Sequence, residues 1–294
     1  MVREVVEMQV GLIGFPVGHS ISPAFQQAAF DSLGLDVDYQ LWETPAERLT
    51  EVVGRLRESN YLGANVTIPH KQAVTSLLDS VDEVARVVGA VNTIVREGKR
   101  LIGYNTDVEG FSRALETDGE SRVSSHRFVV LGAGGAARAV VTAVLLGEPA
   151  SVVVLARRRE QAVALLNDLD RAGILNAASR VDILPLASSN VETEKAVRAA
   201  DVVVNTTPVG MLHHPSEGSM PLPADWLAPG QLVYDLVYNP PETPLLGAAR
   251  ERGARALNGL PMLVYQGAAA FERWTGRAAP VALMTERAGE ALRG

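Results

Sequence analysis

The segment VVLGAGGAARA at residues 129–139 decides the fold that we expect for this 294-residue chain. Gly132, Gly134 and Ala137 match the pattern G-x-G-x-x-A, after an apolar β-branched run and before a helix-forming run. Glycines at such a turn let a pyrophosphate approach backbone N–H groups at a helix N-terminus. A second strand expected at 152–156 completes the βαβ context, so the segment predicts a dinucleotide-binding turn.

Short apolar runs without alternation continue after this turn, which is typical of a parallel sheet covered on both faces. We expect strands in SVVVLAR, VDILPL, ADVVVNTTP and QLVYDLVY, with helices between them and two more helices after residue 259. The first third also alternates: strands in MQVGLIG, VDYQLWET and LGANVTIP, helices over 23–34, 45–59, 71–79 and 80–88, and a hairpin in AVNTIVREGKRLIGYN.

The expected fold class is therefore α/β. An N-terminal α/β substrate domain spans 1–106, and a Rossmann-type doubly wound parallel-sheet domain for the dinucleotide spans 107–258. The C-terminal helices, within 259–294, are expected to return to the substrate domain.

Composition excludes several classes of protein. The net charge of −7, with only short basic runs, argues against a nucleic-acid binder. The chain has no cysteine, which excludes disulfides and thiolate catalysis, and we expect no metal. Residues 1–14 lack the apolar core of a signal peptide, and no apolar run approaches the ~20 residues of a membrane span. We expect a cytoplasmic protein with no membrane partner, either a monomer or a homodimer.

Four polar stretches of the first third suit a small polyhydroxylated acid: GHSISP at 18–23, ANVTIPHK at 64–71, GAVNT at 89–93 and GYNTD at 103–107. Each of their residues also has a structural interpretation, because Ser20, Ser22 and Asp107 could cap helices and Lys71 could be a surface lysine. A helix start disfavours a cation, so we expect Lys71 to face a cleft. A lysine near an aspartate is a usable proton-transfer pair.

The end of the second Rossmann strand indicates the cofactor. A site for NAD usually has an acidic residue there, about 20 residues after the turn. This chain has Ala156 followed by Arg157, Arg158 and Arg159. Guanidinium groups suit a 2′-phosphate, so we expect NADP, with phosphate contacts from Arg157 and Arg158 and a solvated helix start at Arg159.

Over essentially its full length the chain resembles the shikimate dehydrogenase family. The motifs GHSISP, NVTIPHK, GAVNT, GYNTD, GAGGAARA, NTTPVGM, YDLVYNP and MLVYQGAAAF occur in the family's order. The resemblance implies reversible reduction of 3-dehydroshikimate to shikimate with NADPH, a step of aromatic amino-acid biosynthesis.

Site residues follow from the resemblance by position. The implied substrate site consists of Ser20, Ser22, Thr67, Lys71, Asn92, Asp107, Tyr238 and Gln266. Within it, the two serines and the tyrosine would bind the carboxylate, and Lys71 and Asp107 would be the catalytic pair. The implied cofactor site consists of Gly132, Ala133, Gly134, Gly135, Ala136, Ala156, Arg157, Arg158, Thr207, Met211, Leu236 and Gly259.

Two departures from the family's pattern concern the cofactor. The adenosine-phosphate motif usually reads Asn-Arg-Thr with a further basic residue nearby, whereas this chain has Ala156-Arg157-Arg158, then Arg159 and Gln161. The position of Leu236 is often methionine.

Two alternatives stay open. One is a quinate or dual quinate/shikimate dehydrogenase, including one that uses NAD. Quinate-using members often have threonine where this chain has Ser22. The other is a non-catalytic NADP-binding sensor that kept the fold, and the retained Lys71 and Asp107 argue against it.

Overall fold

The computed structural model describes residues 8–175 and 179–293. The chain divides into a first unit, Met1–Thr106 with Val264–Gly294, and a second unit, Asp107–Leu263. Residues 1–7, on which part of the signal-peptide expectation rests, lie outside the described residues. The second boundary falls after Leu263, whereas the sequence indicated 258/259. Gly259 N donates to Val237 O at 3.1 Å, which ties this stretch to the second unit.

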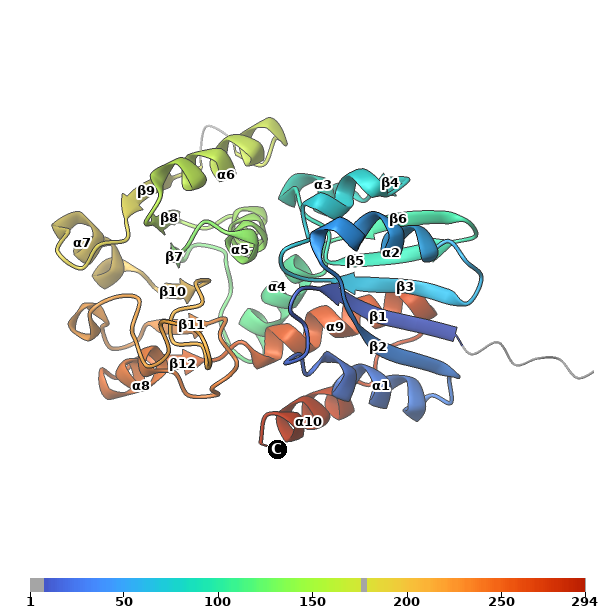
Figure 1. The fold of residues 1–294 in the computed structure, drawn as a ribbon. Coiled ribbons are helices and arrows are strands. Elements are labelled where there is room, and N and C mark those ends of the chain that lie inside the picture. Colours follow the sequence, from blue (N-terminus) through green and yellow to red (C-terminus); the bar gives the residue numbers. More distant parts are fainter. Residues whose placement is uncertain (1–7, 176–178, 294) are drawn as a thin grey trace, which may run out of the picture. The chain divides into compact units, whose positions relative to one another are not determined.

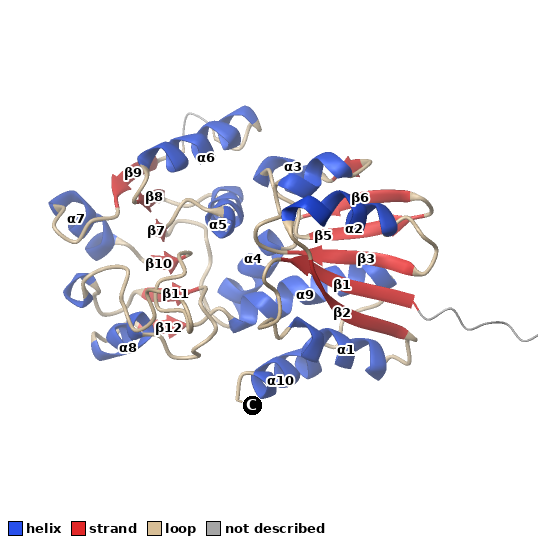
Figure 2. Ribbon diagram, viewed as in Figure 1, coloured by secondary structure: helices blue, strands red, loops and turns tan. Residues whose placement is uncertain are grey.

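A mainly parallel sheet forms the centre of the first unit (Figures 1 and 2). Its strands are β1 (Met8–Gly14), β2 (Val37–Glu43), β3 (Tyr61–Val66), β4 (Ser80–Val81), β5 (Thr93–Glu97) and β6 (Arg100–Tyr104). They lie in the order β2-β1-β3-β5-β6-β4, and β5 runs antiparallel to both of its neighbours. The first residue of β5 therefore lies at the same edge as the last residues of β3 and β6.

Helices cover both faces of this sheet. They are α1 (Ser22–Ser32), α2 (Leu49–Arg55), α3 (Glu83–Val88), α9 (Leu260–Thr275) and α10 (Val281–Ala291). Residues of α2 and α3 join Ile13 and Ile94 in one buried cluster. On α1 the Phe30 ring contacts Phe271 of α9 at 4.9 Å between centroids, and α10 packs against α1. The C-terminal helices thus complete the first unit, as expected.

Three helices predicted for this unit are shorter or of another kind. Segment 45–59 forms the 3₁₀ turn η1 (Ala46–Arg48) followed by α2, and segment 71–79 contains only the 3₁₀ turn η2 (Ala73–Leu77). Segment 80–88 starts with strand β4, because Ser80 and Val81 pair with β6. α3 begins after Asp82, whose carboxylate accepts a hydrogen bond from Ala85 N at 2.8 Å.

The second unit contains an all-parallel sheet. Its strands are β7 (Arg127–Leu131), β8 (Ser151–Ala156), β9 (Val181–Pro185), β10 (Val202–Asn205), β11 (Leu232–Asp235) and β12 (Arg255–Leu257). They lie in the order β12-β11-β10-β7-β8-β9. This is the doubly wound Rossmann order, which confirms the expected fold class, and its topological switch point lies between β7 and β10.

Helices also cover both faces of the second sheet (Figure 2). They are α4 (Asp107–Thr117), α5 (Gly135–Leu146), α6 (Arg159–Arg171), α7 (Val191–Ala199) and α8 (Pro244–Glu251). Val129 and Val203 point into the cluster that contains residues of α7 and α8. Tyr234 points to the other face, where its ring stacks on Phe111 of α4 at 5.3 Å. The β-branched runs thus face a core on each side, as parallel strands require.

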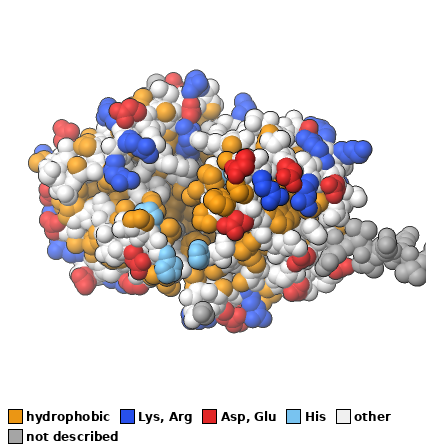
Figure 3. All heavy atoms as spheres, viewed as in Figure 1, with side chains coloured by type: hydrophobic (Ala, Val, Ile, Leu, Met, Phe, Trp, Pro, Cys, Tyr) orange, Lys and Arg blue, Asp and Glu red, His pale blue; other side chains and the backbone are white. Residues whose placement is uncertain are grey.

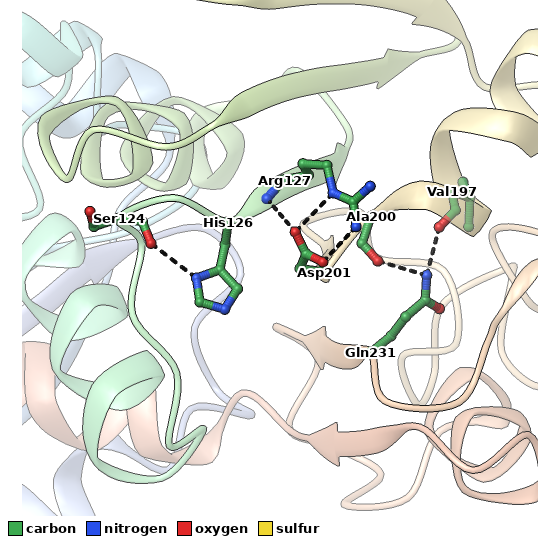
Figure 4. A network of polar contacts seen from close by, with 7 residues as sticks. All are labelled: Ser124, His126, Arg127, Val197, Ala200, Asp201 and Gln231. Carbon is green, nitrogen blue, oxygen red and sulfur yellow. Dashed lines mark hydrogen bonds and ion pairs between the residues drawn. The ribbon is translucent and has the colours of Figure 1, made fainter.

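A polar network ties together the amino-terminal ends of these strands (Figure 4). Arg127 donates to Asp201 from its backbone N and from its guanidinium, each at 2.8 Å. That hydrogen-bonded guanidinium lowers the pKa of Asp201 to about 2. Gln231 Nε2 donates to Val197 O at 2.7 Å and to Ala200 O at 2.9 Å. The starts of β7, β10 and β11 are therefore fixed by side chains.

Surface charge and helix length bear on two classes of partner, nucleic acids and membranes. Basic and acidic side chains are mixed over the face shown in Figure 3 and do not form a basic stripe there. Among the described residues, no helix combines the length and the apolar character that crossing a membrane needs.

Candidate active site

The polar stretches of the first unit meet at one edge of its sheet. Ser20 follows β1, Thr67 and Lys71 follow β3, and Asn92 precedes the antiparallel β5. Backbone hydrogen bonds extend the sheet into these loops: Thr67 N donates to Ile13 O at 2.8 Å, and Asn92 N donates to Tyr104 O at 3.0 Å. The strand topology therefore brings together side chains that lie far apart in the sequence.

Two hydroxyls mark the start of α1. Ser20 Oγ donates to Ser22 Oγ at 3.1 Å and accepts a hydrogen bond from Ser22 N at 3.2 Å. Ser22 is the first residue of α1, and Ile21 at the N-cap position supplies no side-chain cap. Ser20 thus has a structural role at the helix start. The hydroxyl pair beside a helix N-terminus also suits a carboxylate.

A network of amides and hydroxyls holds Asn92. Its Nδ2 donates to Thr106 Oγ1 at 2.9 Å and to Gln266 Oε1 at 3.2 Å, and its Oδ1 accepts from Thr106 N at 2.8 Å. Thr93 Oγ1 also donates to Asn92 Oδ1, at 3.1 Å. Asn92 and Gln266, both implied substrate residues, are therefore direct neighbours.

Two buried residues behind this network had no predicted role. Asn65 Nδ2 donates to Thr93 Oγ1 at 3.2 Å, and Tyr39 Oη donates to Asn65 Oδ1 at 2.8 Å. Burial raises the pKa of Tyr39, so its hydroxyl keeps the proton that it donates. The sequence did carry a signal for Asn65, because an amide inside an apolar strand needs hydrogen-bond partners.

The local structure around Lys71 differs from the helix start that the sequence predicted. Lys71 is half-buried and lies between β3 and the short η2, so it does not begin an α-helix and the helix-dipole argument does not apply. Its carbonyl accepts a hydrogen bond from Val91 N at 2.7 Å, which fixes its backbone beside Asn92. His70, the residue before it, is buried, and its Nε2 lies 2.6 Å from Thr44 O.

Asp107 and Tyr238 belong to the second unit. Asp107 is buried and is the first residue of α4, directly after Thr106. Tyr238 follows β11, and burial raises the pKa of its hydroxyl, which therefore remains a hydrogen-bond donor at neutral pH.

The glycine-rich turn of the second unit has room for a ligand at one end only. A Cβ on Gly132, whose φ is +111°, would lie 2.6 Å from Thr206 Oγ1 at the switch point. A Cβ on Gly134 or Gly135 would meet no described atom within 4 Å. Gly134 is the N-cap of α5 and offers no side-chain cap, so the first N–H groups of this helix are available to a phosphate.

The three arginines after β8 differ in their contacts. Arg159 Nη1 donates to Ile183 O at 3.0 Å, which ties Arg159 to β9. Arg157 and Arg158 are exposed, and their side chains form no hydrogen bond or ion pair with the described residues. The N–H donors of these two guanidinium groups beside Ala156 are therefore available to a ligand.

The other implied cofactor residues lie on three loops at the carboxyl edge of the second sheet, after β10, β11 and β12. Thr207 donates to Asn205 Oδ1 from its backbone N at 3.0 Å and from its hydroxyl at 2.7 Å, and Met211 farther along this loop is exposed. The backbones of Leu236 and Gly259 lie so close together that a Cβ on Gly259 would be 2.0 Å from Leu236 O. Only glycine fits there.

Comparisons with known proteins agree with this geometry. The profile of the "Shikimate dehydrogenase substrate binding domain" matches residues 12–94, and that of the "Shikimate 5'-dehydrogenase C-terminal domain" matches residues 259–288. A protein of Moorella thermoacetica named shikimate dehydrogenase (NADP(+)) is 47% identical over 96% of this chain and 93% of its own length. The chain belongs to the shikimate dehydrogenase family.

Solved structures of the family extend the likeness to the whole fold. The shikimate 5-dehydrogenase of Thermus thermophilus, in complex with NADP(H) and shikimate, is 37% identical and has a TM-score of 0.84, over 97% of this chain and 100% of that one. The quinate dehydrogenase of Corynebacterium glutamicum, in complex with NAD, is 32% identical with a TM-score of 0.84, over 96% of this chain and 98% of that one.

Proposed function

We propose that this protein is an NADP-dependent shikimate dehydrogenase that catalyses the reversible reduction of 3-dehydroshikimate to shikimate. The proposal rests on membership in the family together with the polar edge of the first sheet, where hydroxyls and amides lie beside Lys71. Full-length relatives named for this activity support the same substrate and cofactor. The cytoplasmic location and the monomeric or homodimeric state expected from the sequence stay predictions.

Substrate recognition falls to neutral donors in this proposal. Ser20, Ser22 and Tyr238 bind the carboxylate, while Thr67, Asn92 and Gln266 hold the ring hydroxyls. Each is a directional hydrogen-bonding group, and several are already fixed by their neighbours. Selection therefore depends on the geometry of the donors more than on net charge.

Proton transfer falls to Lys71, positioned by Asp107. NADPH, when bound, supplies the hydride. As the carbonyl carbon is reduced, negative charge develops on its oxygen. The Lys71 ammonium stabilises that charge and donates the proton, and in the reverse direction the neutral amine accepts it.

The cofactor site of the second unit fits NADP. The open space at Gly134 and Gly135 leaves the N-terminus of α5 to the pyrophosphate. Arg157 and Arg158 have guanidinium donors for a 2′-phosphate, and no carboxylate ends β8 to receive a ribose hydroxyl. Thr207, Met211, Leu236 and Gly259 would then lie toward the nicotinamide.

An absorbance assay at the wavelength of NADPH tests the proposal, with shikimate or quinate offered together with NADP or NAD. We expect the highest kcat/KM for shikimate with NADP. Equal or higher kcat/KM with quinate would favour the quinate dehydrogenase alternative. Binding of NADP without turnover of either acid would favour the sensor.

A further inference from the structure

Asp235 is a buried carboxylate without a cationic partner among the described residues. It is the last residue of β11, it is fully buried, and it forms no ion pair with the described residues. Three donors surround it: Thr243 Oγ1 at 2.7 Å from Oδ2, with Asn205 Nδ2 at 2.9 Å and Val237 N at 3.1 Å from Oδ1. Burial outweighs these bonds and raises the pKa of Asp235 to about 6. A group so costly to bury needs an explanation.

The three donors come from three separate pieces of chain. Asn205 ends β10, and its Oδ1 accepts both hydrogen bonds of Thr207, while its Nδ2 also lies 3.4 Å from Val209 O. Val237 follows Asp235 and lies between Leu236 and Tyr238. Thr243 is the N-cap of α8, where its Oγ1 accepts from Leu246 N at 3.3 Å. Asp235 thus joins the end of β10, the loop after β11 and the start of α8.

We propose that Asp235 is a positioning residue for the nicotinamide half of the cofactor site, which it organises through Asn205 and Val237. The inference rests on the proposed function, because it takes Thr207, Met211 and Leu236 to lie toward the nicotinamide. The relay from Asp235 through Asn205 ends on Thr207. The same carboxylate holds the backbone beside Leu236.

A carboxylate suits this position better than the amide of the same shape. Both oxygens of Asp235 accept, and all three neighbours donate. In Asp235→Asn one oxygen still accepts from Asn205 and Val237, but the new NH₂ faces the Thr243 hydroxyl, whose proton loses its acceptor. This variant keeps two of the three bonds and removes a buried charge, so we expect it to fold. Asp235→Ala removes all three bonds.

Calorimetric titration with two ligands tests the proposal without requiring turnover. NADP spans both halves of the site, whereas adenosine 2′,5′-bisphosphate carries only the half that Arg157 and Arg158 would hold. We expect Asp235→Asn to weaken NADP binding about fivefold, which corresponds to about 1 kcal/mol, and Asp235→Ala to weaken it more. Both variants should bind adenosine 2′,5′-bisphosphate within about twofold of wild type.

Asp201→Asn is the matched control, because the same substitution in the same unit breaks the network at the opposite end of β10 (Figure 4). It should leave the affinities for both ligands unchanged. Equal losses for the two ligands in Asp235→Asn would show a general structural role and overturn the proposal, as would unchanged NADP affinity. A wild-type protein that binds NADP but does not oxidise shikimate contradicts the proposed function alone.

Discussion

The functional edges of the two sheets are built from different chemistry. At the edge of the first sheet, the side chains of Asn92 and Thr106 bond each other, and Val91 N binds the Lys71 carbonyl beside them. At the edge of the second sheet, the turn at Gly134 offers backbone N–H groups and empty space. One edge thus presents mainly side-chain groups, and the turn at the other presents mainly main-chain groups. Single substitutions should therefore act on the reaction at the first edge and on cofactor choice at the second.

The largest effect should come from Lys71→Met at the first edge. Loss of the proton donor should lower kcat by roughly 10²–10⁴-fold, the usual contribution of a positioned acid–base group, with a much smaller change in KM. Steady-state kinetics with shikimate and NADP measure this. Lys99→Met is the control, because Lys99 is an exposed lysine of the same unit. A Lys71→Met enzyme with near-normal kcat would remove the catalytic role and with it the contrast between the edges.

The next effect should come from Arg157→Ala at the second edge. Losing charge-assisted bonds to the 2′-phosphate should lower kcat/KM for NADP by about 10–100-fold, and kcat/KM for NAD by no more than about twofold. Arg159→Ala is the control, because Ile183 O already holds that guanidinium. If both cofactors lost equally, Arg157 would be structural.

A smaller effect should come from Ser22. Ser22→Ala leaves part of the carboxylate without a donor and should raise KM for shikimate. Ser22→Thr adds one methyl and should shift the ratio of kcat/KM for shikimate to kcat/KM for quinate by an amount equivalent to about 1–3 kcal/mol. Ser32→Ala, at the other end of α1, should change neither quantity. Comparable kcat/KM for the two acids in the wild-type protein would contradict the predicted specificity.

The last effect concerns stability rather than catalysis, and it compares two carboxylates of the second sheet, Asp235 and Asp201. The pKa of Asp235 is raised to about 6, so its favourable contribution is full below about pH 4 and is lost as the pH rises through 6. The pKa of Asp201 is lowered to about 2, so its contribution is present above about pH 4 and is lost as the pH falls through 2.

Urea unfolding of two variants measures this difference. Relative to wild type, Asp235→Asn should gain stability between about pH 4 and pH 7, by at most about 2–3 kcal/mol. Asp201→Asn should lose no more than about 1 kcal/mol at pH 7, because its ion pair is solvent-exposed. Parallel pH profiles for the two variants would contradict the assignment.

How much the sequence could predict differs between the two edges. The turn at Gly132 and the basic residues after β8 are local features, so the pattern of strand, turn and helix in the sequence was enough to predict them. Asp235 was within a quoted motif but had no role, because its partners Asn205 and Thr243 lie 30 residues before it and 8 residues after it. Contacts of that kind depend on strand order, which composition and periodicity do not specify.

Local structure around Lys71 shows the same limit. The expected helix over 71–79 failed because Val91 N binds the Lys71 carbonyl and His70 lies against Thr44, both tertiary contacts that override helix propensity. By contrast, Asp82 is a residue type that favours the N-cap position. Its place in the sequence would have been enough to predict that α3 begins at residue 83. Tertiary hydrogen bonds, more than propensity, decide which of these segments become regular helices.

The first unit is made from two separated pieces of chain, and this orders events during synthesis. The second unit is one continuous segment, so every residue that it needs has left the ribosome before the last residues of the first unit have done so. The first unit still lacks Trp274, whose Nε1 donates to Ile94 O at 2.9 Å, and Gly267, whose carbonyl accepts from Gln26. The part of its sheet that α9 covers therefore stays exposed until α9 has been synthesised, and transiently exposed apolar surface of this kind promotes aggregation of incomplete chains.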